Sequence, residues 1–545
     1  MSTTPFAITL DVGSSLANKT GSWRVERPVY VDRLPPCNNA CPAGENIQGW
    51  LYEAEEGNYE AAWRLIMRSN PLPAIMGRAC FHPCESACNR VQIDDAVGIN
   101  AVERFLGDKA IEEGWTVAVT AAPSGRRVLV VGSGPAGLSA AYHLRLAGHE
   151  VEIREAAALP GGMLRYGIPQ YRLPRDVVDA EIARIEAMGV RIRLLSHVDD
   201  VAQTMASDGF DAAFVGIGAQ RGKHPDIPSG DAAKVLDAVS MLHGFEEGEG
   251  PVLGRRVVVY GGGDTAMDAA RTAQRLGATE TIVVYRRTRD RMPAHDEEVL
   301  DAQAEGVQMR WLSTVARAEG GRLMIEKMVL NDQGLAESTG EFEELEADSL
   351  VLALGQDTDL SLFDALDDVD TSGGVINVDA RQMTGHDGVF AGGDAASTSS
   401  GERTVTAAVG HGSLAAAAID AWLAGTTYEP APQRAPASVE RLNPWYYADA
   451  PRTMRPRLEA IRRRSNFDEV VGGLTAEDAL FEARRCMSCG NCFECDNCFG
   501  VCPDNAVIKL GPGLRYEFNL EYCKGCGICA KECPCGAIDM VPEHR

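Results

Sequence analysis

Apolar residues in the middle of the chain form short continuous runs that alternate with stretches of helical spacing. The runs at residues 127–131 and 256–260 are almost wholly apolar, and each leads through a glycine-rich turn into a helix-like stretch. Further strand-like runs follow at residues 150–155, 281–285 and 349–354. Strands that alternate with helices in this way predict an α/β fold with two Rossmann-like domains.

A helical pattern precedes the first of these domains. Apolar residues recur there at helical spacing, with one break near Gly57-Asn58. They are Trp50, Leu51, Ala54, Ala62, Trp63, Leu65 and Ile66. This spacing predicts a small helical domain, whereas residues 1–36 carry little pattern and are expected to form an extended arm.

The turn after the first run carries a dinucleotide-binding fingerprint. Its sequence is Gly132-Ser133-Gly134-Pro135-Ala136-Gly137, and the acidic Glu155 follows about twenty residues later. The glycines permit a tight turn and a close approach of a pyrophosphate to the helix N-terminus. Glu155 is expected to accept hydrogen bonds from ribose hydroxyls; the alternative is a solvated residue at a strand end.

A second fingerprint follows the run at 256–260. It reads Gly261-Gly262-Gly263-Asp264-Thr265-Ala266, with alanine at the third glycine position. The next strand ends in Arg286-Arg287 instead of an acid, and Arg291 is a less secure third candidate. Because arginine binds phosphate bidentately, this pair favours NADPH over NADH, unless both arginines are only solvated.

Eleven of the sixteen cysteines lie between Arg485 and Cys535. Eight of them form two Cys-x2-Cys-x2-Cys-x3-Cys-Pro runs, namely Cys492, Cys495, Cys498 and Cys502, then Cys523, Cys526, Cys529 and Cys533. This spacing is typical of a ferredoxin with two [4Fe–4S] clusters, in which the fourth cysteine of each run ligates the other cluster. Disulfides or zinc are the less specific alternatives. The tail is therefore predicted to move single electrons.

Five more cysteines flank the N-terminal helical pattern: Cys37, Cys41, Cys80, Cys84 and Cys88. Five cysteines cannot complete two four-iron clusters, which need eight ligands. They complete one cluster with a spare, or borrow ligands from elsewhere. Packing cysteines are the alternative, since free cysteine is often buried.

Composition narrows the class of protein. The 545 residues carry a formal net charge of −26, which argues against nucleic acid or an anionic membrane as a partner. No apolar run approaches the ~18 residues of a membrane span, and the first residues lack a signal peptide. Clustered cysteines without export indicate metal ligation, so a cytoplasmic protein is expected.

The segment after Glu155 makes the sequence resemble a known family. Residues 160–169 read Pro-Gly-Gly-Met-Leu-Arg-Tyr-Gly-Ile-Pro, and 171–174 read Tyr-Arg-Leu-Pro. The chain is similar here to the small subunit of glutamate synthase, the flavin half of dihydropyrimidine dehydrogenase and the large subunit of NADH-dependent ferredoxin:NADP oxidoreductase. That resemblance implies a glutathione-reductase-like flavoprotein with FAD at the first fingerprint and NAD(P)H at the second.

The resemblance also implies cofactor contacts outside the two fingerprints. Those toward the flavin are Gly162, Leu164, Arg172, Asp394 and Thr404, and Gly355 belongs to a loop that closes over nicotinamide. Hydride transfer from nicotinamide to flavin needs orientation more than a protein acid or base, so no catalytic residue is expected. His411 is read as a packing or capping residue, with proton donation as the alternative.

The chain departs from the family pattern at its N-terminus, which lacks an extra Cys-x2-Cys-Gly. Residues 486–490 of the tail, Cys-Met-Ser-Cys-Gly, look like the missing stretch. Ligand counting then assigns Cys37, Cys88, Cys486 and Cys489 to one cluster. It assigns Cys41, Cys80 and Cys84 to another, with Glu103 as the fourth ligand or, alternatively, as a solvated helix residue. The total is four clusters.

The expected domains are an arm and helical iron–sulfur domain (1–122), an FAD domain (123–250 with 376–424), an NAD(P)H domain (251–375), a linker (425–480) and an α+β ferredoxin domain (481–545).

The predicted function is electron transfer between NAD(P)H, FAD and [4Fe–4S] clusters, to or from ferredoxin or a partner subunit such as a 2-oxoacid oxidoreductase. The alternatives are a glutamate synthase small subunit and a non-catalytic wiring subunit. A hetero-oligomer without nucleic acid or a membrane span is expected.

Overall fold

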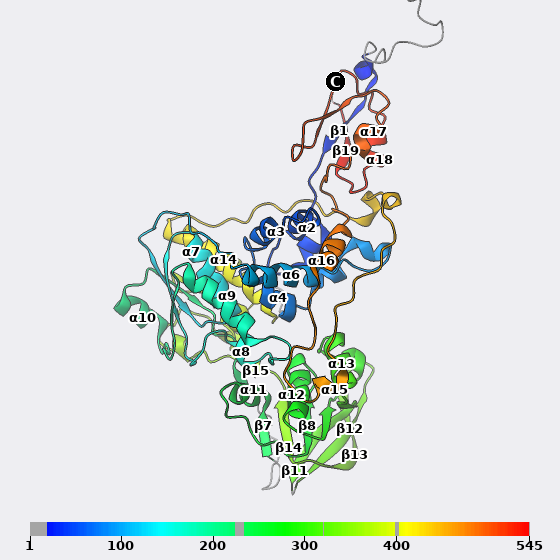
Figure 1. Cartoon of the computed structure of the whole chain (residues 1–545). Helices are drawn as coiled ribbons and strands as arrows, with labels where there is room; N and C mark the ends of the chain where they lie inside the picture. Colours follow the sequence, from blue (N-terminus) through cyan, green and yellow to red (C-terminus); the bar gives the residue numbers. More distant parts are fainter. Residues whose placement is uncertain (1–18, 224–233, 320, 398–402, 544–545) are drawn as a thin grey trace, which may run out of the picture.

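The structure is a computed structural model that describes residues 19–223, 234–319, 321–397 and 403–543. Figure 1 shows the N-terminal helices in the middle of the molecule, one Rossmann-like sheet to one side, the second below, and the cysteine-rich tail at the opposite end. Among the described helices, none is long and apolar enough to span a bilayer. The predicted α/β architecture, with a helical domain before it and a small α+β domain after it, is confirmed.

The N-terminal domain consists of short helices around one apolar core. Trp50, Leu51, Ile66 and Leu106 are almost fully buried there, and Ala483 from the tail completes the cluster. The helices are α1 (Pro36–Ala40), α2 (Ile47–Glu55), α3 (Tyr59–Ile66), α4 (Pro73–Ala79), α5 (Pro83–Ser86) and α6 (Ile99–Glu112).

The first Rossmann-like sheet has the strand order β16-β5-β2-β3-β4, and all its pairings are parallel. Its strands are β2 (Arg127–Val131), β3 (Glu150–Arg154), β4 (Arg191–Arg193), β5 (Ala212–Val215) and β16 (Val389–Ala391). The accompanying helices are α7 (Pro135–Leu146), α8 (Met163–Tyr166), α9 (Arg175–Ala187), α10 (Val201–Asp208) and α14 (Val405–Leu423). Helices α7 and α14 touch closely, because a Cβ atom on Gly412 would lie 2.3 Å from the Ala136 carbonyl oxygen. Strand β16 and helix α14, which come late in the sequence, thus complete the domain that begins with β2.

The second sheet has the order β10-β9-β8-β14-β7 and is also parallel. Its strands are β7 (Lys234–Asp237), β8 (Arg256–Gly261), β9 (Glu280–Val284), β10 (Gln308–Arg310) and β14 (Ser349–Ala353). Helices α11 (Ala238–Glu246), α12 (Asp264–Arg275) and α13 (Asp296–Ala304) accompany it. An antiparallel sheet of β11 (Ser313–Glu319), β12 (Arg322–Leu330) and β13 (Ala336–Glu346) adjoins it. The short pair β6 (Arg221–Gly222) and β15 (Gln356–Asp357) connects the two Rossmann-like domains.

The tail holds α16 (Ala476–Arg484), α17 (Asn497–Gly500), α18 (Ile528–Lys531) and the hairpin of β17 (Val507–Lys509) and β18 (Tyr516–Phe518). Its last strand, β19 (Ile538–Pro542), pairs antiparallel with β1 (Glu26–Tyr30) from the other end of the chain, with Tyr30 opposite Ile538. The N-terminal arm therefore belongs to the ferredoxin-like unit, as Figure 1 shows. The weak sequence pattern of this short edge strand gave no sign of that partner.

Candidate functional site

A cavity of about 740 Å³ lies beside both nucleotide fingerprints. From the first fingerprint, Gly132, Gly134, Pro135 and Ala136 line it, whereas Gly137 packs under its own loop, where a Cβ atom would lie 2.0 Å from the Gly132 carbonyl oxygen. Such a volume is within the ~300–1,000 Å³ of cofactor and ligand pockets. The pyrophosphate loop thus opens onto a space that can accept a dinucleotide.

Glu155 lies at the wall of this cavity and is 8% exposed. One carboxylate oxygen accepts a 2.9 Å hydrogen bond from the Ser133 backbone N–H and a further bond from the Ser133 hydroxyl. The other accepts a 2.8 Å bond from the Ala157 N–H. Glu155 therefore ties the glycine-rich turn to the end of β3 and forms part of the cavity wall.

The returning part of the first domain closes another wall. Asp394 and Thr404 line the cavity. The Thr404 hydroxyl accepts a 3.2 Å hydrogen bond from the Ala407 N–H and so caps the N-terminus of α14. His411 accepts a 3.2 Å bond at Nδ1 from the Gly393 N–H, and burial lowers the pKa of His411. The neutral ring therefore holds the Gly393 loop, which is the capping role.

The residues implied by the family resemblance divide into two groups. Gly162 and Arg172 line the cavity, whereas Leu164 is fully buried in the core of the first domain and is not among the described lining residues. Arg172 forms ion pairs of 2.7 Å with Asp268 and 2.9 Å with Glu298, both in the second domain. Its guanidinium thus joins the two Rossmann-like domains beside the cavity.

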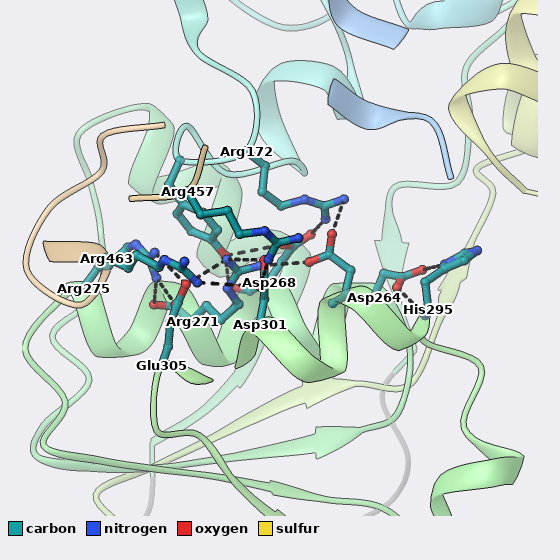
Figure 2. Close-up of polar contacts among 12 residues, drawn as sticks. Arg172, Asp264, Asp268, Arg271, Arg275, His295, Asp301, Glu305, Arg457 and Arg463 are labelled. Carbon is teal, nitrogen blue, oxygen red and sulfur yellow. Dashed lines mark hydrogen bonds and ion pairs between the residues drawn. The ribbon is translucent and has the colours of Figure 1, made fainter. Parts of the chain in front are cut away.

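Two residues of the second fingerprint, Asp264 and Thr265, reach the same cavity. The Asp264 carboxylate accepts 2.9 Å hydrogen bonds from the backbone N–H of His295 and from its Nδ1 (Figure 2). The remaining candidates lie outside the described cavity wall: Gly261, Gly263, Ala266, Arg286, Arg287 and Gly355. The arginine pair nevertheless follows β9 directly after Tyr285, whose ring lies against Gly262 of this fingerprint. Arg286 is exposed, and the buried Arg287 Nε has no hydrogen-bond partner among the described atoms.

A buried ionic cluster underlies α12 and was not foreseen from the sequence. The fully buried Glu305 binds Arg271 at 2.8 Å and Arg275 at 2.6 Å (Figure 2). Arg457 and Arg463, from the segment between α14 and α16, both pair with Asp301 of this domain. The spacing of charges in the sequence could not reveal partners that lie some 150 residues away.

The linker also contacts the other two domains. Glu469 pairs with Arg78 at 2.7 Å and Arg104 at 3.0 Å in the helical domain, and the Val470 N–H donates to the Tyr171 carbonyl. It is therefore a strap across three domains rather than a free connection.

Four cysteines from both ends of the chain line one small cavity: Cys37, Cys88, Cys486 and Cys489. Burial, and then the proximity of Cys486, Cys88 and Cys489, raises the pKa of Cys37 well above its usual value. Helix α16 delivers the tail pair by packing against α2 and α6. The structure thus brings together the four cysteines that ligand counting grouped.

The other N-terminal cysteines gather around Glu103, which is 6% exposed. Burial, and then Glu103, raises the pKa of Cys80 to about 12, and a hydrogen bond with Thr406 of α14 opposes this shift. Burial also raises the pKa of Cys84, and the nearby Cys80, Glu103 and Cys41 raise it further. A second carboxylate, Glu45, lies beside them, and burial raises its pKa to about 7. Glu45 was missed because it has no place in a cysteine pattern.

The tail cysteines also form two sets of four. Cys502 lines one cavity with Cys523, Cys526 and Cys529 of the other run. In the second set, burial raises the pKa of Cys498 to about 11, and Cys492, Cys495 and Cys533 add to the shift. The fourth cysteine of each run therefore lies with the first three of the other.

A site for a single metal ion differs from a cluster site in how closely its ligands converge. In the part of the chain that the structure describes, no three His, Cys, Asp or Glu side chains converge closely enough to hold one metal ion. A [4Fe–4S] cluster takes one thiolate on each of its four irons and so spaces its ligands more widely than one ion does. The sets of four cysteines suit the donor chemistry of such clusters.

Comparison with known proteins gives three matches to family models. Residues 126–412 match the model described as pyridine nucleotide-disulphide oxidoreductase. Residues 26–115 match dihydropyrimidine dehydrogenase domain II, 4Fe-4S cluster, and residues 516–539 match a 4Fe-4S binding domain. The first match covers more than half of the chain.

Curated relatives extend over most of the chain. It is 36% identical to NADP(+)-dependent formate dehydrogenase subunit beta of Moorella thermoacetica, over 83% of this chain and 70% of that one. It is 31% identical to NADPH-Fe(3+) oxidoreductase subunit beta of Geobacter sulfurreducens, over 85% and 77%. It is 34% identical to the glutamate synthase [NADPH] small chain of Azospirillum brasilense, over 66% and 81%. The chain spans half the length of the relative YgfK of Escherichia coli.

Proposed function

Because the chain belongs to the pyridine nucleotide-disulphide oxidoreductase family, we propose that it oxidises NADPH beside α12 and sends the electrons through FAD into four [4Fe–4S] clusters. That it is an FAD- and NADP-dependent iron–sulfur oxidoreductase follows from its family and relatives. The order of transfer, the ligands and the direction are the proposal. The domain bounds expected above enter the proposal with two changes: β1 goes with the ferredoxin-like unit, and β7, which pairs with β14, goes with the NAD(P)H domain.

Each nucleotide has a group of residues that would hold it. The turn from Gly132 to Ala136, together with Glu155, would hold the FAD pyrophosphate and ribose, and the N-terminus of α14 would face the flavin ring. Gly263, Thr265 and the pair Arg286-Arg287 would hold NADPH. A bound flavin supplies the exchange between a two-electron hydride and single electrons. His411 stays neutral in this scheme and holds the loop of Gly393.

One observation carries the order of transfer. Ala79 and Phe81 line the large cavity, and Cys80 between them lies against Glu103 and the first turn of α14. The set of Cys41, Cys80, Cys84 and Glu103 is therefore proposed as the first cluster after the flavin.

Chain connectivity then orders the remaining three sets. Cys37 lies in the short helix α1 and Cys41 is the residue directly after that helix, so the set of Cys37, Cys88, Cys486 and Cys489 follows. Only Gly490 and Asn491 separate it from Cys492 and the first tail set. Helix α17 connects that set to Cys502 of the last one.

The electron acceptor is proposed to dock at the tail, where Cys495 and Cys526 are exposed. The three relatives are named as subunits or a small chain, so this chain is proposed to work in a hetero-oligomer. Ferredoxin or a partner oxidoreductase subunit, such as one acting on a 2-oxoacid, is the proposed partner. A glutamate-forming large subunit is the second candidate, favoured by the glutamate synthase relative.

Anaerobic reduction tests the proposal. NADPH should bleach the flavin absorbance, and cluster signals in electron paramagnetic resonance (EPR) should follow, with about sixteen irons per chain at four per cluster. NADH should act more weakly. Flavin bleaching without cluster reduction would support the transfer from NADPH to FAD and contradict the transfer from FAD to the clusters. No bleaching would favour a non-catalytic wiring subunit. Co-purified subunits would then distinguish the two candidate partners.

A further inference from the structure

The N-terminal arm reaches the tail cysteines through one side chain. The Tyr30 hydroxyl lies 3.3 Å from Cys498 Sγ, although 468 residues separate them along the chain. A thiolate ligand carries no proton, whereas a phenol at neutral pH does, so the hydroxyl is the donor in the loaded protein. Tyr30 thus contacts the first tail set of cysteines directly.

The same ring also reaches the second tail set. Tyr30 stacks on Phe518 with ring centroids 5.0 Å apart, and Phe518 lines the cavity of Cys502 and Cys523. Pro28, on the same strand, lines that cavity too. Strand β1 is therefore part of the wall of both tail sites.

Further contacts fix the arm in this position. The Arg24 guanidinium donates a 2.9 Å hydrogen bond to the Cys523 carbonyl and pairs with Glu543 at 2.7 Å. A Cβ atom on Gly525 would lie 2.2 Å from the Glu26 carbonyl oxygen, so this close approach requires glycine. The Tyr30 hydroxyl is consequently held at the sulfur by a paired strand and a buried arginine.

We propose that Tyr30 is a positioning residue that sets the reduction potential of the first tail cluster through its hydrogen bond to Cys498. Hydrogen bonds to ligand sulfurs are among the factors that set cluster potentials. Reduction adds negative charge that spreads onto the sulfurs, so a donor stabilises the reduced cluster and raises its potential. The inference rests on the proposed assignment of the eight tail cysteines to two clusters.

The test is an EPR-monitored redox titration of full-length Tyr30→Phe, which keeps the ring on Phe518 and removes the hydroxyl. One cluster should become harder to reduce. At a fixed potential, the ratio of its reduced to its oxidised form should fall several-fold. A tenfold fall corresponds to a shift of about 59 mV in the midpoint potential of a one-electron couple. The other three clusters should keep their wild-type midpoints. The iron content should not change.

Tyr446→Phe is the matched control, because the Tyr446 hydroxyl also lies in this region but donates at 2.6 Å to the Glu532 carboxylate. It should leave every midpoint unchanged. Unchanged midpoints in Tyr30→Phe at full iron content would overturn the proposal, as would an equal shift in the control or a loss of tail iron. A wild-type protein with less than about eight irons in its tail would instead refute the cluster assignment itself, at four per cluster.

Discussion

The Glu103 carboxylate accepts a 2.8 Å hydrogen bond from the Asn70 side-chain amide beside Cys41, Cys80 and Cys84. The same amide donates at 2.9 Å to Glu45, so two buried carboxylates share one donor. Burial raises the pKa of both carboxyls, and the charge of Glu45 adds to the shift at Glu103, so the two negative charges would need compensation here. Iron would supply that compensation, which makes this pocket better suited to the loaded protein than to the free chain.

Glu103→Ala should therefore alter one cluster and leave the other three intact. Without the carboxylate, one iron has no protein ligand, and we expect a [3Fe–4S] signal in EPR with about one iron lost per chain. Glu45→Gln is the matched control, since it retains Glu103 and should keep the full iron content. A full iron count without a new signal in Glu103→Ala would remove it from the ligand set.

Cysteine spacing predicted the two sets in the tail, because ligand geometry constrains short segments of backbone, whereas the family resemblance and ligand counting predicted the two sets that include the N-terminal cysteines. It could not predict Glu45 or Asn70, which reach the pocket through the packing of α2, α4 and α6. The fingerprints likewise predicted the cavity wall at Gly132 and Asp264, since a glycine turn between a strand and a helix has one local geometry. The pairing of β1 with β19 and the Glu305 cluster depend on contacts between distant segments, which no local pattern encodes.

Replacing both Arg286 and Arg287 by glutamine should weaken NADPH selectively. Loss of a charged hydrogen bond costs about 1.5–3 kcal/mol, so KM for NADPH should rise at least tenfold while KM for NADH changes little. Arg289→Gln serves as the control, because Arg289 already pairs with Asp296 at 3.2 Å. Steady-state flavin reduction with each nucleotide measures the effect. An equal rise for both nucleotides would contradict a 2′-phosphate site.

Glu305→Gln should destabilise the nucleotide-binding domain, because it leaves Arg271 and Arg275 buried without their carboxylate. Breaking a buried pair in this way costs about 3–5 kcal/mol. Glu341→Gln is the control, since its 3.1 Å pair with Lys327 is exposed and is worth at most about 1 kcal/mol. Urea denaturation of the two variants measures the difference, and equal midpoints would show that the buried cluster contributes nothing.

The carboxyl group of Glu305 should also make the stability of the protein depend on pH. Burial raises the pKa of Glu305, but hydrogen bonds from Arg275 and Arg271 outweigh it, and the pKa is lowered from 4.5. A folded-state pKa below the unfolded one gives stability that is present above about pH 4.5 and is lost as the pH falls. Wild type should therefore lose more stability than Glu305→Gln on acidification below that pH. Parallel losses would indicate that other carboxyls cause the acid sensitivity.

Cys486→Ser combined with Cys489→Ser should remove one cluster, although both residues lie in the tail. If the pair serves the set of Cys37 and Cys88, the variant loses about four irons while both ferredoxin clusters remain. Truncation sharpens the test: ending the chain at Arg484 should cost three clusters, whereas ending it at Asn491 should cost two. Arg485 itself anchors this segment, with hydrogen bonds to the Ala96 carbonyl at 2.9 Å and the Asp95 carbonyl at 2.7 Å, so the serine variant is the cleaner measurement. Equal iron counts in the two truncations would place Cys486 and Cys489 outside any cluster and leave Cys37 and Cys88 without partners.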